Sequence, residues 1–330
     1  MIRLAIIGCG EHSESGHAIP LARYKAAHPT AIELAAVCDL NAERAQSFVR
    51  TYGFTRYYVD VNEMLAGEKL DGCIVVVPVE SISELGIKIL RRGIPCVVEK
   101  PMGASLSEAQ ALLDAAKSTG TPNLVSVNRR FMPFLNRALE WSRNEDSRRA
   151  GSLRHVRCTM ARHARREHDF LWTTAVHAVD TLRYIAGKVT EANIRSLRAP
   201  AGGANWYGID LRFEAGVTGY IDVLPTSGMV EETYELFGEG FRATVICPFG
   251  PQRGWRGFRD NRLVIEEVAS AGIDEEILNG CFDEAAEFVW ALSSNNAPRP
   301  SIEDIFPSVE LCFTLAKTVN EQQDLVPTKI

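Results

Sequence analysis

Glu99 and Lys100 form an acid–amine pair between a short apolar run and Pro101. The run, residues 95–98, is rich in β-branched residues and bounded by prolines, so it predicts a buried strand that ends abruptly. Pro101 disfavours helical backbone at Lys100, and a lysine at the carboxyl end of a buried strand in an open α/β sheet lies where ligands bind. Taken alone, the pair fits a solvated strand end better, because most lysines are solvated. The elements that precede it favour a functional lysine.

A glycine turn follows the first predicted strand, residues 2–7. Gly8 permits a tight turn, and Gly10 lets the backbone approach a pyrophosphate at the start of a helix predicted over about 16–27. Two glycines alone are a weak signal, but their place after the first strand is informative. Strand, glycine turn and helix together predict the opening of a dinucleotide-binding unit.

The glycine turn departs from the G-x-G-x-x-G pattern, because Ser13 stands where the third glycine is usual. Gly16 takes that role if the loop 11–15 is longer than usual. Glu11 and His12, in this loop, are candidate cofactor-binding residues together with the glycines.

Asp39 ends a second predicted strand, residues 32–38. An acid at this place hydrogen-bonds the adenosine ribose hydroxyls and repels a ribose phosphate. Leu40 and Asn41 follow, with no adjacent arginine to receive that phosphate, which favours NAD over NADP. The alternative is that Asp39 merely caps the next helix, predicted over 41–52, and the two roles are compatible.

Strands and helices alternate as far as residue 127, which predicts an α/β fold with a doubly wound parallel sheet. The nearly continuous apolar character of the strands fits a sheet covered on both faces. Further strands are predicted at 56–59, 73–77 and 123–127, and helices at 82–92 and 105–118.

From residue 153 onward, strands dominate the predicted structure. The stretch 248–260 is rich in Gly, Arg and aromatic residues and is interpreted as a pocket-edge or interface loop, or as surface. Strands are predicted at 153–160, 194–197, 207–213, 218–224, 233–237, 243–246 and 262–266, and helices at 174–186, 279–292 and 305–322.

Composition excludes several classes of protein. With 330 residues, about two domains are expected. The net charge is -6 and no long basic run indicates nucleic-acid binding, while no apolar run approaches the ~18 residues of a membrane span. The chain enters a strand at once, which argues against a signal peptide. Its eight cysteines are scattered without metal-finger spacing, so free thiols and a cytoplasmic location are expected.

Several elements occur in an order that resembles the glucose–fructose oxidoreductase / inositol dehydrogenase / rhizopine catabolism (Gfo/Idh/MocA) oxidoreductases. The resemblance covers essentially the whole chain. Its elements are Gly8-x-Gly10, Asp39, Glu99-Lys100-Pro101, Asn128-Arg129-Arg130-Phe131, and His177-x-x-Asp180 followed by Leu182-Arg183-Tyr184.

The resemblance implies NAD(P), a Rossmann domain, assigned here to residues 1–127, and a second domain, residues 128–330, that binds substrate. The second domain is expected to be α+β with an open, mostly antiparallel sheet. Because one face of that sheet lacks helices and must be covered, and because the family commonly uses it for oligomer contacts, we expect a homodimer or homotetramer. The usual reaction of the family is oxidation of a sugar or polyol hydroxyl, or its reverse.

The resemblance also implies roles for individual residues. Lys100 and His177 are the expected catalytic residues, with Lys100 as hydrogen-bond donor to the substrate oxygen and His177 as general base. Glu99 is expected to anchor Lys100. Pro78, Asn128 and Arg130 join the expected cofactor site, the last two at its nicotinamide end.

Two further departures concern the site. Val77-Pro78-Val79-Glu80 stands where the family often has Thr-Pro-Asn and a nearby His, so Ile82 removes one contact near the cofactor. Thr173 stands four residues before His177, where the family often has Asp, and Thr does not take a proton in ordinary chemistry. Thr173 and Asp180 are candidate substrate contacts.

The stretch 161–169 contains three arginines and two histidines. Arg162 is a candidate substrate contact, but a solvated loop or a subunit contact is slightly favoured for the stretch. His163 and His168 do not make a zinc pattern with His177, so no metal is expected.

The sequence favours hydride transfer between NAD and a secondary alcohol of a small sugar-like substrate. Two other classes stay open. One is an NAD-dependent glycosidase of the same fold, and the other is a cofactor-binding regulator without turnover.

Overall fold

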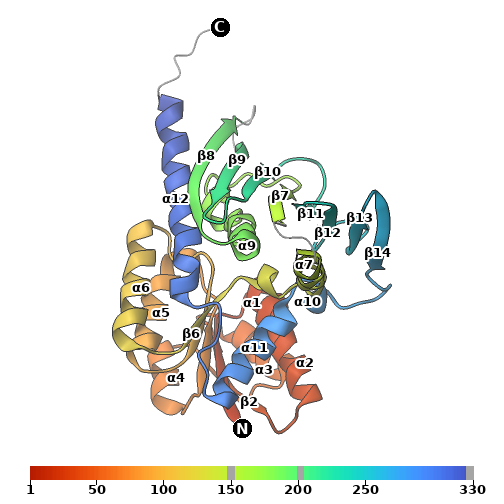
Figure 1. Cartoon of the computed structure of the whole chain (residues 1–330). Helices are drawn as coiled ribbons and strands as arrows, with labels where there is room; N and C mark the ends of the chain where they lie inside the picture. Colours follow the sequence, from red (N-terminus) through yellow and green to blue (C-terminus); the bar gives the residue numbers. More distant parts are fainter. Residues whose placement is uncertain (147–152, 199–203, 325–330) are drawn as a thin grey trace. The chain divides into compact units, whose positions relative to one another are not determined.

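The computed structural model describes residues 1–146, 153–198 and 204–324 (Figure 1). The chain divides into two compact units. The first combines Met1–Asn128 with Gly280–Val309, and the second combines Arg129–Asn279 with the chain from Glu310 onward.

The first unit is built on a six-stranded parallel sheet in the order β3-β2-β1-β4-β5-β6. This order places the chain reversal beside β1, as in dinucleotide-binding sheets. The predicted doubly wound parallel sheet is confirmed. Its strands are β1 (Ile2–Ile7), β2 (Ile32–Cys38), β3 (Arg56–Tyr58), β4 (Gly72–Val75), β5 (Cys96–Glu99) and β6 (Asn123–Ser126).

Helices connect these strands, and their caps follow from the sequence. The side chain of Asn41 accepts hydrogen bonds from the amides of Glu43 and Arg44 at the start of α3, and Ser105 caps α6. The helix α4 was not predicted. The helical segments are α1 (Glu11–Ser13), the π-helical η1 (Glu14–Ala18), α2 (Ile19–Ala27), α3 (Ala42–Tyr52), α4 (Val61–Gly67), α5 (Val79–Arg91), α6 (Leu106–Thr119) and α11 (Cys281–Ser294).

The helix α11 returns from the far end of the sequence to the first unit. Phe288 and Val289 are buried in the same core cluster as Leu4 and Ile74. The predicted division at residue 127 assigned this helix to the second domain. It was wrong there because an amphipathic helix does not reveal which distant surface covers its apolar side.

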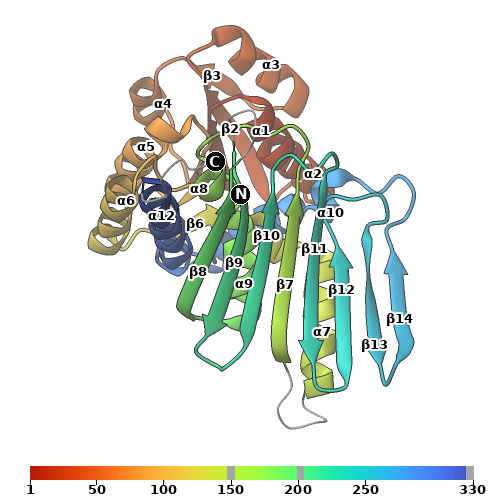
Figure 2. The same ribbon diagram turned by 90° about the horizontal axis from the view of Figure 1, so that it is seen from above.

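The second unit is built on an eight-stranded sheet in the order β14-β13-β12-β11-β7-β10-β9-β8 (Figure 2). Every neighbouring pair is antiparallel except β7 and β10. The expected mostly antiparallel sheet is therefore confirmed. Its strands are β7 (Leu153–Ala161), β8 (Val189–Leu197), β9 (Trp206–Phe213), β10 (Thr218–Leu224), β11 (Glu231–Gly238), β12 (Phe241–Ile246), β13 (Gly254–Arg259) and β14 (Arg262–Val268).

Helices cover one face of this sheet. In Figure 2, α7 lies behind β11 and β12, and α9 lies behind β9 and β10. Buried and more exposed residues alternate along β9, β10 and β11, as expected for a sheet with one covered face. The helical segments beyond the first unit are η2 (Asn128–Phe131), α7 (Pro133–Asp146), α8 (Phe170–Thr173), α9 (Val176–Ala186), α10 (Glu275–Leu278) and α12 (Ile302–Asp324), the last of which begins in the first unit.

The strand β13 corrects the interpretation of 248–260 as a loop. Its glycines disguised it, because glycine is depleted in strands. Gly257 lies under the indole of Trp141 on α7, and a Cβ there would come within 3.1 Å of that ring. Close packing of the helix on the strand therefore explains a glycine that looks like a turn residue.

The other face of the second sheet carries charged residues that pair across strands. Charged side chains of this kind are well solvated in water, so this face does not need to be covered by another subunit. The expected dimer or tetramer then depends on the family resemblance. The pairs are Arg157–Asp222, Arg195–Asp210, Arg212–Glu191, Arg242–Glu235 and Arg256–Glu266.

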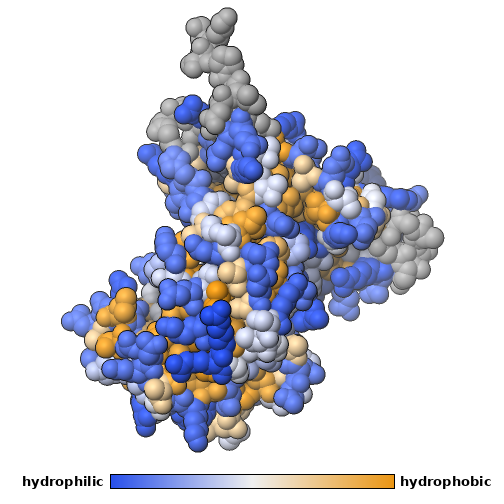
Figure 3. All heavy atoms as spheres, turned by 90° about the vertical axis from the view of Figure 1, so that its left-hand side faces the viewer, coloured by the Kyte–Doolittle hydropathy of each residue, from blue (hydrophilic) through white to orange (hydrophobic). Residues whose placement is uncertain are grey.

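Figure 3 shows hydrophilic and hydrophobic residues intermixed on the face that it presents. Within residues 1–146, 153–198 and 204–324, no helix combines the length and the apolar character needed to cross a bilayer.

Candidate functional site

The glycine turn after β1 is shaped by close packing. Gly8 has a φ of +96°, and a Cβ there would lie 1.8 Å from the carbonyl oxygen of Val76, so only glycine fits. A Cβ at Gly10 would meet no atom within 4 Å. The backbone at Gly10 therefore faces open space that a ligand group can approach.

A pocket of about 820 Å³ lies at the carboxyl ends of the strands in the first unit. Ligands bind at this end of open α/β sheets. The structure gathers most of the predicted cofactor residues around it. Those among its lining are Gly8, Gly10, Glu11, His12, Asp39, Pro78, Glu99 and Lys100.

Asp39 links the end of β2 to the glycine turn. Its carboxylate accepts a hydrogen bond from the amide of Cys9 at 2.7 Å and another from the amide of Asn41 at 2.8 Å. The cap of α3 is Asn41, so the alternative that Asp39 caps this helix is wrong. Burial, with a smaller contribution from the Asp39 carboxylate, raises the pKa of Cys9 to about 12, which keeps this thiol protonated.

Arg44 bears on the choice of cofactor. The sequence shows no arginine directly after Asp39, but the first turn of α3 brings Arg44 into the lining of the same pocket. A guanidinium suits a phosphate, whereas the Asp39 carboxylate repels one. The pocket therefore contains a residue that favours NAD, Asp39, and a residue that favours NADP, Arg44. Arg44 was missed in the sequence because only the residues directly after Asp39 were considered.

The segment after Gly10 is helical from Glu11, so the long loop expected at 11–15 is not present. A Cβ at Gly16 would lie 3.8 Å from the His12 ring, an ordinary contact, and no packing requires glycine there. The expectation that Gly16 replaces the third glycine is therefore wrong. Ser13 is buried within this first turn and lines the pocket.

Glu99, at the end of β5, lies at the centre of a cluster of histidines. Its Oε1 accepts hydrogen bonds from Nε2 of His12 at 3.0 Å and Nε2 of His17 at 2.9 Å. Its Oε2 accepts the backbone amide of Lys100 at 3.0 Å. Burial alone would raise the pKa of Glu99, but His12 and His17 outweigh it and hold the pKa well below its usual value. The expected anchoring of Lys100 by Glu99 thus has a specific form, a bond to the lysine backbone.

His17 was not singled out in the sequence. A histidine on the apolar side of the first helix was the only signal, and a satisfied core histidine is the ordinary interpretation of it. Asn128, also buried in the first unit, donates its amide to Sγ of Cys281 at 3.5 Å.

His177 and Asp180 lie in the first turns of α9 in the second unit, and both are buried. Arg130 donates to both oxygens of Asp180, each at 2.8 Å, and its guanidinium lies over the ring of Tyr184. Asp180 is thus a bonded core carboxylate rather than a helix-surface group. Arg130 thus bonds to Asp180 within the second unit, and its expected place at the nicotinamide end of the cofactor pocket stays a prediction.

Thr173 ends the short helix α8. Its hydroxyl donates to the backbone carbonyl of Asp169 at 3.0 Å, four residues earlier. Because the hydroxyl proton is used in this bond, the Thr173 oxygen can only accept a hydrogen bond from a further partner. The residue is half-buried, which is consistent with a contact to a ligand.

Arg162 is buried, unlike the exposed His163, Arg166 and His168 that follow it. The solvated-loop interpretation is therefore wrong for Arg162. Its guanidinium donates to the carboxylate of Glu232, a residue 70 positions later that the sequence did not single out.

Glu232 is shared between two arginines. Arg129 donates to it at 2.8 and 3.2 Å, and the hydroxyl of Tyr234 donates at 2.8 Å. Burial would raise the pKa of Glu232, but Arg129 and Arg162 lower it to about 2. Both guanidiniums also lie over the ring of Phe249. This network fixes the carboxyl end of β7 against β11.

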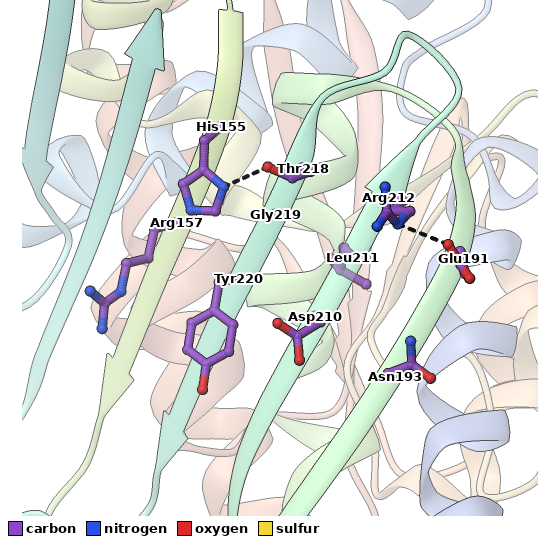
Figure 4. Close-up of a pocket in the computed structure, with 10 residues that line it drawn as sticks. All are labelled: His155, Arg157, Glu191, Asn193, Asp210, Leu211, Arg212, Thr218, Gly219 and Tyr220. Carbon is purple, nitrogen blue, oxygen red and sulfur yellow. Dashed lines mark hydrogen bonds and ion pairs between the residues drawn. The ribbon is translucent and has the colours of Figure 1, made fainter.

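A second recess, of about 580 Å³, lies on the uncovered face of the second sheet. Figure 4 shows His155, Arg157, Tyr220 and Asp210 projecting from neighbouring strands, with His155 bonded to Thr218 and Arg212 paired with Glu191. These side chains already form ion pairs or hydrogen bonds across strands, so the recess does not have the character of a proton-transfer site. Among the described residues, no group of three or more His, Cys, Asp or Glu side chains is placed to hold a metal ion.

Comparison with known proteins adds relatives. Residues 2–128 match the family described as "Oxidoreductase family, NAD-binding Rossmann fold" (GFO_IDH_MocA). A 4-carboxy-2-hydroxymuconate-6-semialdehyde dehydrogenase of Sphingobium sp. is 26% identical over 301 residues, covering 88% of this chain and 92% of the relative. A myo-inositol 2-dehydrogenase of Thermotoga maritima is 21% identical over 314 residues, covering 88% and 90%. A D-apiose dehydrogenase of Paraburkholderia graminis is 27% identical over 215 residues, and the match spans only 56% of that relative.

Solved structures share the fold. A dehydrogenase from Chromobacterium violaceum has a TM-score of 0.85 at 17% identity, covering 98% of this chain and 97% of the other. An oxidoreductase from Agrobacterium radiobacter, solved in complex with NAD+, L-tartaric acid and magnesium, has a TM-score of 0.77 at 20% identity, covering 98% and 96%. At these identities the likeness establishes the fold.

Proposed function

Because the chain belongs to the Gfo/Idh/MocA family of oxidoreductases with an NAD-binding Rossmann fold, we propose that it transfers a hydride between NAD and a secondary alcohol. The substrate class is a sugar, a polyol or a related compound. The observation that carries the proposal is the pocket of the first unit, where a glycine turn, Asp39 and Lys100 meet at the carboxyl ends of parallel strands.

The residues present fit a dinucleotide. Gly8 makes the turn that only glycine allows, and Gly10 leaves open space at the start of the first helix for a pyrophosphate. Two backbone amides hold the carboxylate of Asp39, which would hydrogen-bond the ribose hydroxyls of the dinucleotide. When bound, the nicotinamide accepts or supplies the hydride, and the protein positions the reacting carbon and manages one proton.

Lys100 and His177 divide the remaining work in this proposal. Lys100, held at its backbone by Glu99, donates a hydrogen bond to the substrate oxygen. His177 acts as general base, because its ordinary pKa lies near neutrality. Arg130 fixes Asp180 one helical turn from His177, which supports the orientation of that helix. Thr173 contributes at most a hydrogen bond, since its proton is shared with a backbone carbonyl.

A screen of sugars, polyols and their acids tests the function, with absorbance of the reduced nicotinamide as readout. Lys100→Ala and His177→Ala should each lower turnover of the best substrate by about 10²-fold or more, the usual scale for acid–base groups. His177→Ala should retain cofactor binding, because His177 belongs to the other unit. His163→Ala, an exposed histidine of the same unit, is the matched control and should keep full turnover.

The outcomes separate the candidate classes. Unchanged turnover in His177→Ala would overturn its assignment as base. Cleavage of aryl glycosides without net reduction of the cofactor would instead indicate the glycosidase. Tight cofactor binding with no turnover of any compound would indicate the regulator.

Two finer expectations belong to the same proposal. We expect the protein to work in a reducing compartment such as the cytoplasm, since its eight cysteines are buried free thiols. We also expect a homodimer or homotetramer, in line with the family.

A further inference from the structure

We propose that His12 and His17 are positioning residues for Lys100. Through their shared bonds to Glu99, they couple the helix that begins at the glycine turn to the backbone of the expected catalytic lysine. The inference rests on the proposed function for the role of Lys100, and it adds two residues that the mechanism above does not use.

The path is a chain of short contacts. His17, which is buried, and His12, whose side chain is 61% exposed in the pocket, both reach Oε1 of Glu99. Oε2 of the same carboxylate accepts the amide of Lys100 at 3.0 Å. One oxygen of Glu99 therefore binds the two histidines of the first helix, and the other binds the backbone of Lys100. A shift of that helix moves the carboxylate, and with it the lysine backbone.

The local helix geometry makes the shared oxygen accessible. His12 and His17 are five residues apart, and in a regular α-helix such residues point about 140° apart. The segment Glu14–Ala18 is π-helical, with hydrogen bonds that span five residues. This wider turn brings both imidazoles to the same side. Such π-turns are often found at functional sites, and this one adjoins the glycine turn.

Charged and titratable groups on the neighbouring elements define the electrostatics of Glu99. The first helix contributes His12 and His17, and β5 contributes Lys100 directly after Glu99. The helix α11 contributes Glu284, which lines a small cavity together with His17 and is bonded by Ser126 of β6. His12 and His17 are thus the groups that favour the ionised form of the buried Glu99 carboxylate.

The sign of the pH effect follows from these partners. Burial raises the pKa of Glu99 and the histidines lower it well below its usual value. Removing the N–H donor of His17 removes part of the lowering influence, so the pKa of Glu99 should rise. The acid limb of turnover should then move to higher pH.

The test compares His17→Leu, which removes the donor, with His17→Gln, which keeps one N–H donor. His28→Leu, at the exposed end of the same helical segment, is the control. We expect turnover in His17→Leu to fall about 10- to 100-fold, the scale of a misplaced catalytic group. Cofactor affinity should stay within about 3-fold of wild type, and the acid limb should move to higher pH. His17→Gln should recover most of the loss, and His28→Leu should match wild type.

A second measurement needs no substrate. In NMR spectra of the protein labelled at glutamate carboxyls and backbone amides, with Glu99→Gln used for assignment, the Glu99 carboxylate should titrate well below the usual range. The Lys100 amide proton should move upfield in His17→Leu as its bond weakens. An ordinary Glu99 titration in wild type, or an unchanged Lys100 amide in a folded His17→Leu, would overturn the inference. Failure of the substrate screen with these NMR results intact would count against the proposed function alone.

Discussion

Replacing Glu232 by glutamine probes whether the buried arginines of the second unit hold the fold or a ligand. Glu232 is fully buried and accepts hydrogen bonds from Arg129, Arg162 and Tyr234. Its pKa falls from 4.5 to about 2. Each pKa unit corresponds to about 1.4 kcal/mol, so the shift represents roughly 3 kcal/mol of stability. Breaking a buried ion pair by removing one partner typically costs about 3–5 kcal/mol, which agrees in scale.

The dependence on pH has a definite sign. A carboxyl group whose pKa is depressed in the folded state stabilises the fold above its unfolded pKa, and this contribution is lost as pH falls toward the folded pKa. Wild type should therefore exceed Glu232→Gln by about 3 kcal/mol at pH 7. The difference should shrink between about pH 4.5 and about pH 2.

Urea unfolding followed by tryptophan fluorescence measures this difference. The signal reports mainly the second unit, because four of the five tryptophans lie there. The matched control is Glu266→Gln, since Glu266 and Arg256 form a half-exposed pair on the same sheet. Such surface pairs contribute about 0–1 kcal/mol. A loss in Glu232→Gln no larger than in the control would refute the structural role of the network and return Arg162 to the candidate substrate contacts.

Two other predictions follow from the cofactor pocket and the second sheet. Calorimetric titration should show tighter binding of NAD(H) than of NADP(H), with the preference reduced in Asp39→Ala, and equal or stronger affinity for NADP(H) would instead assign the dominant role to Arg44. Light scattering at micromolar concentration should show a dimer or tetramer, and a monomeric wild type would contradict this expectation. If the uncovered sheet face is the interface, Arg157→Glu on that face should weaken the assembly.

The parts of the fold that the sequence predicts well are those with local signals. The strands β1, β2 and β10 were predicted with the bounds that the structure has, because an apolar run, or one that alternates with polar residues, ends at a turn residue. The strand β13 was interpreted as a loop, and the helix α11 was assigned to the wrong domain. Both depend on partners far along the chain: β13 packs against Trp141, and α11 packs in the core around Leu4.

The site divides in the same way. Gly8, Asp39 and Lys100 were found because each stands at a strand end, a position that the sequence reveals. His17 and Glu232 were missed because their chemistry comes from pairing across 82 and 70 residues. Arg162 was found but misinterpreted for that reason. A charged residue in a polar stretch gives no sign that its partner is a buried carboxylate on another strand.

The two consecutive arginines of η2 bond to different elements of the second unit. Arg129 reaches Glu232 on β11, whereas Arg130 reaches Asp180 on α9. One short turn therefore ties the sheet of the second unit to the helix that carries His177. Both bonds are bidentate or nearly so and largely buried, a geometry that arginine supplies and lysine does not. The Asn-Arg-Arg-Phe element thus helps to position His177, the proposed general base, because it fixes the helix α9 on which His177 lies.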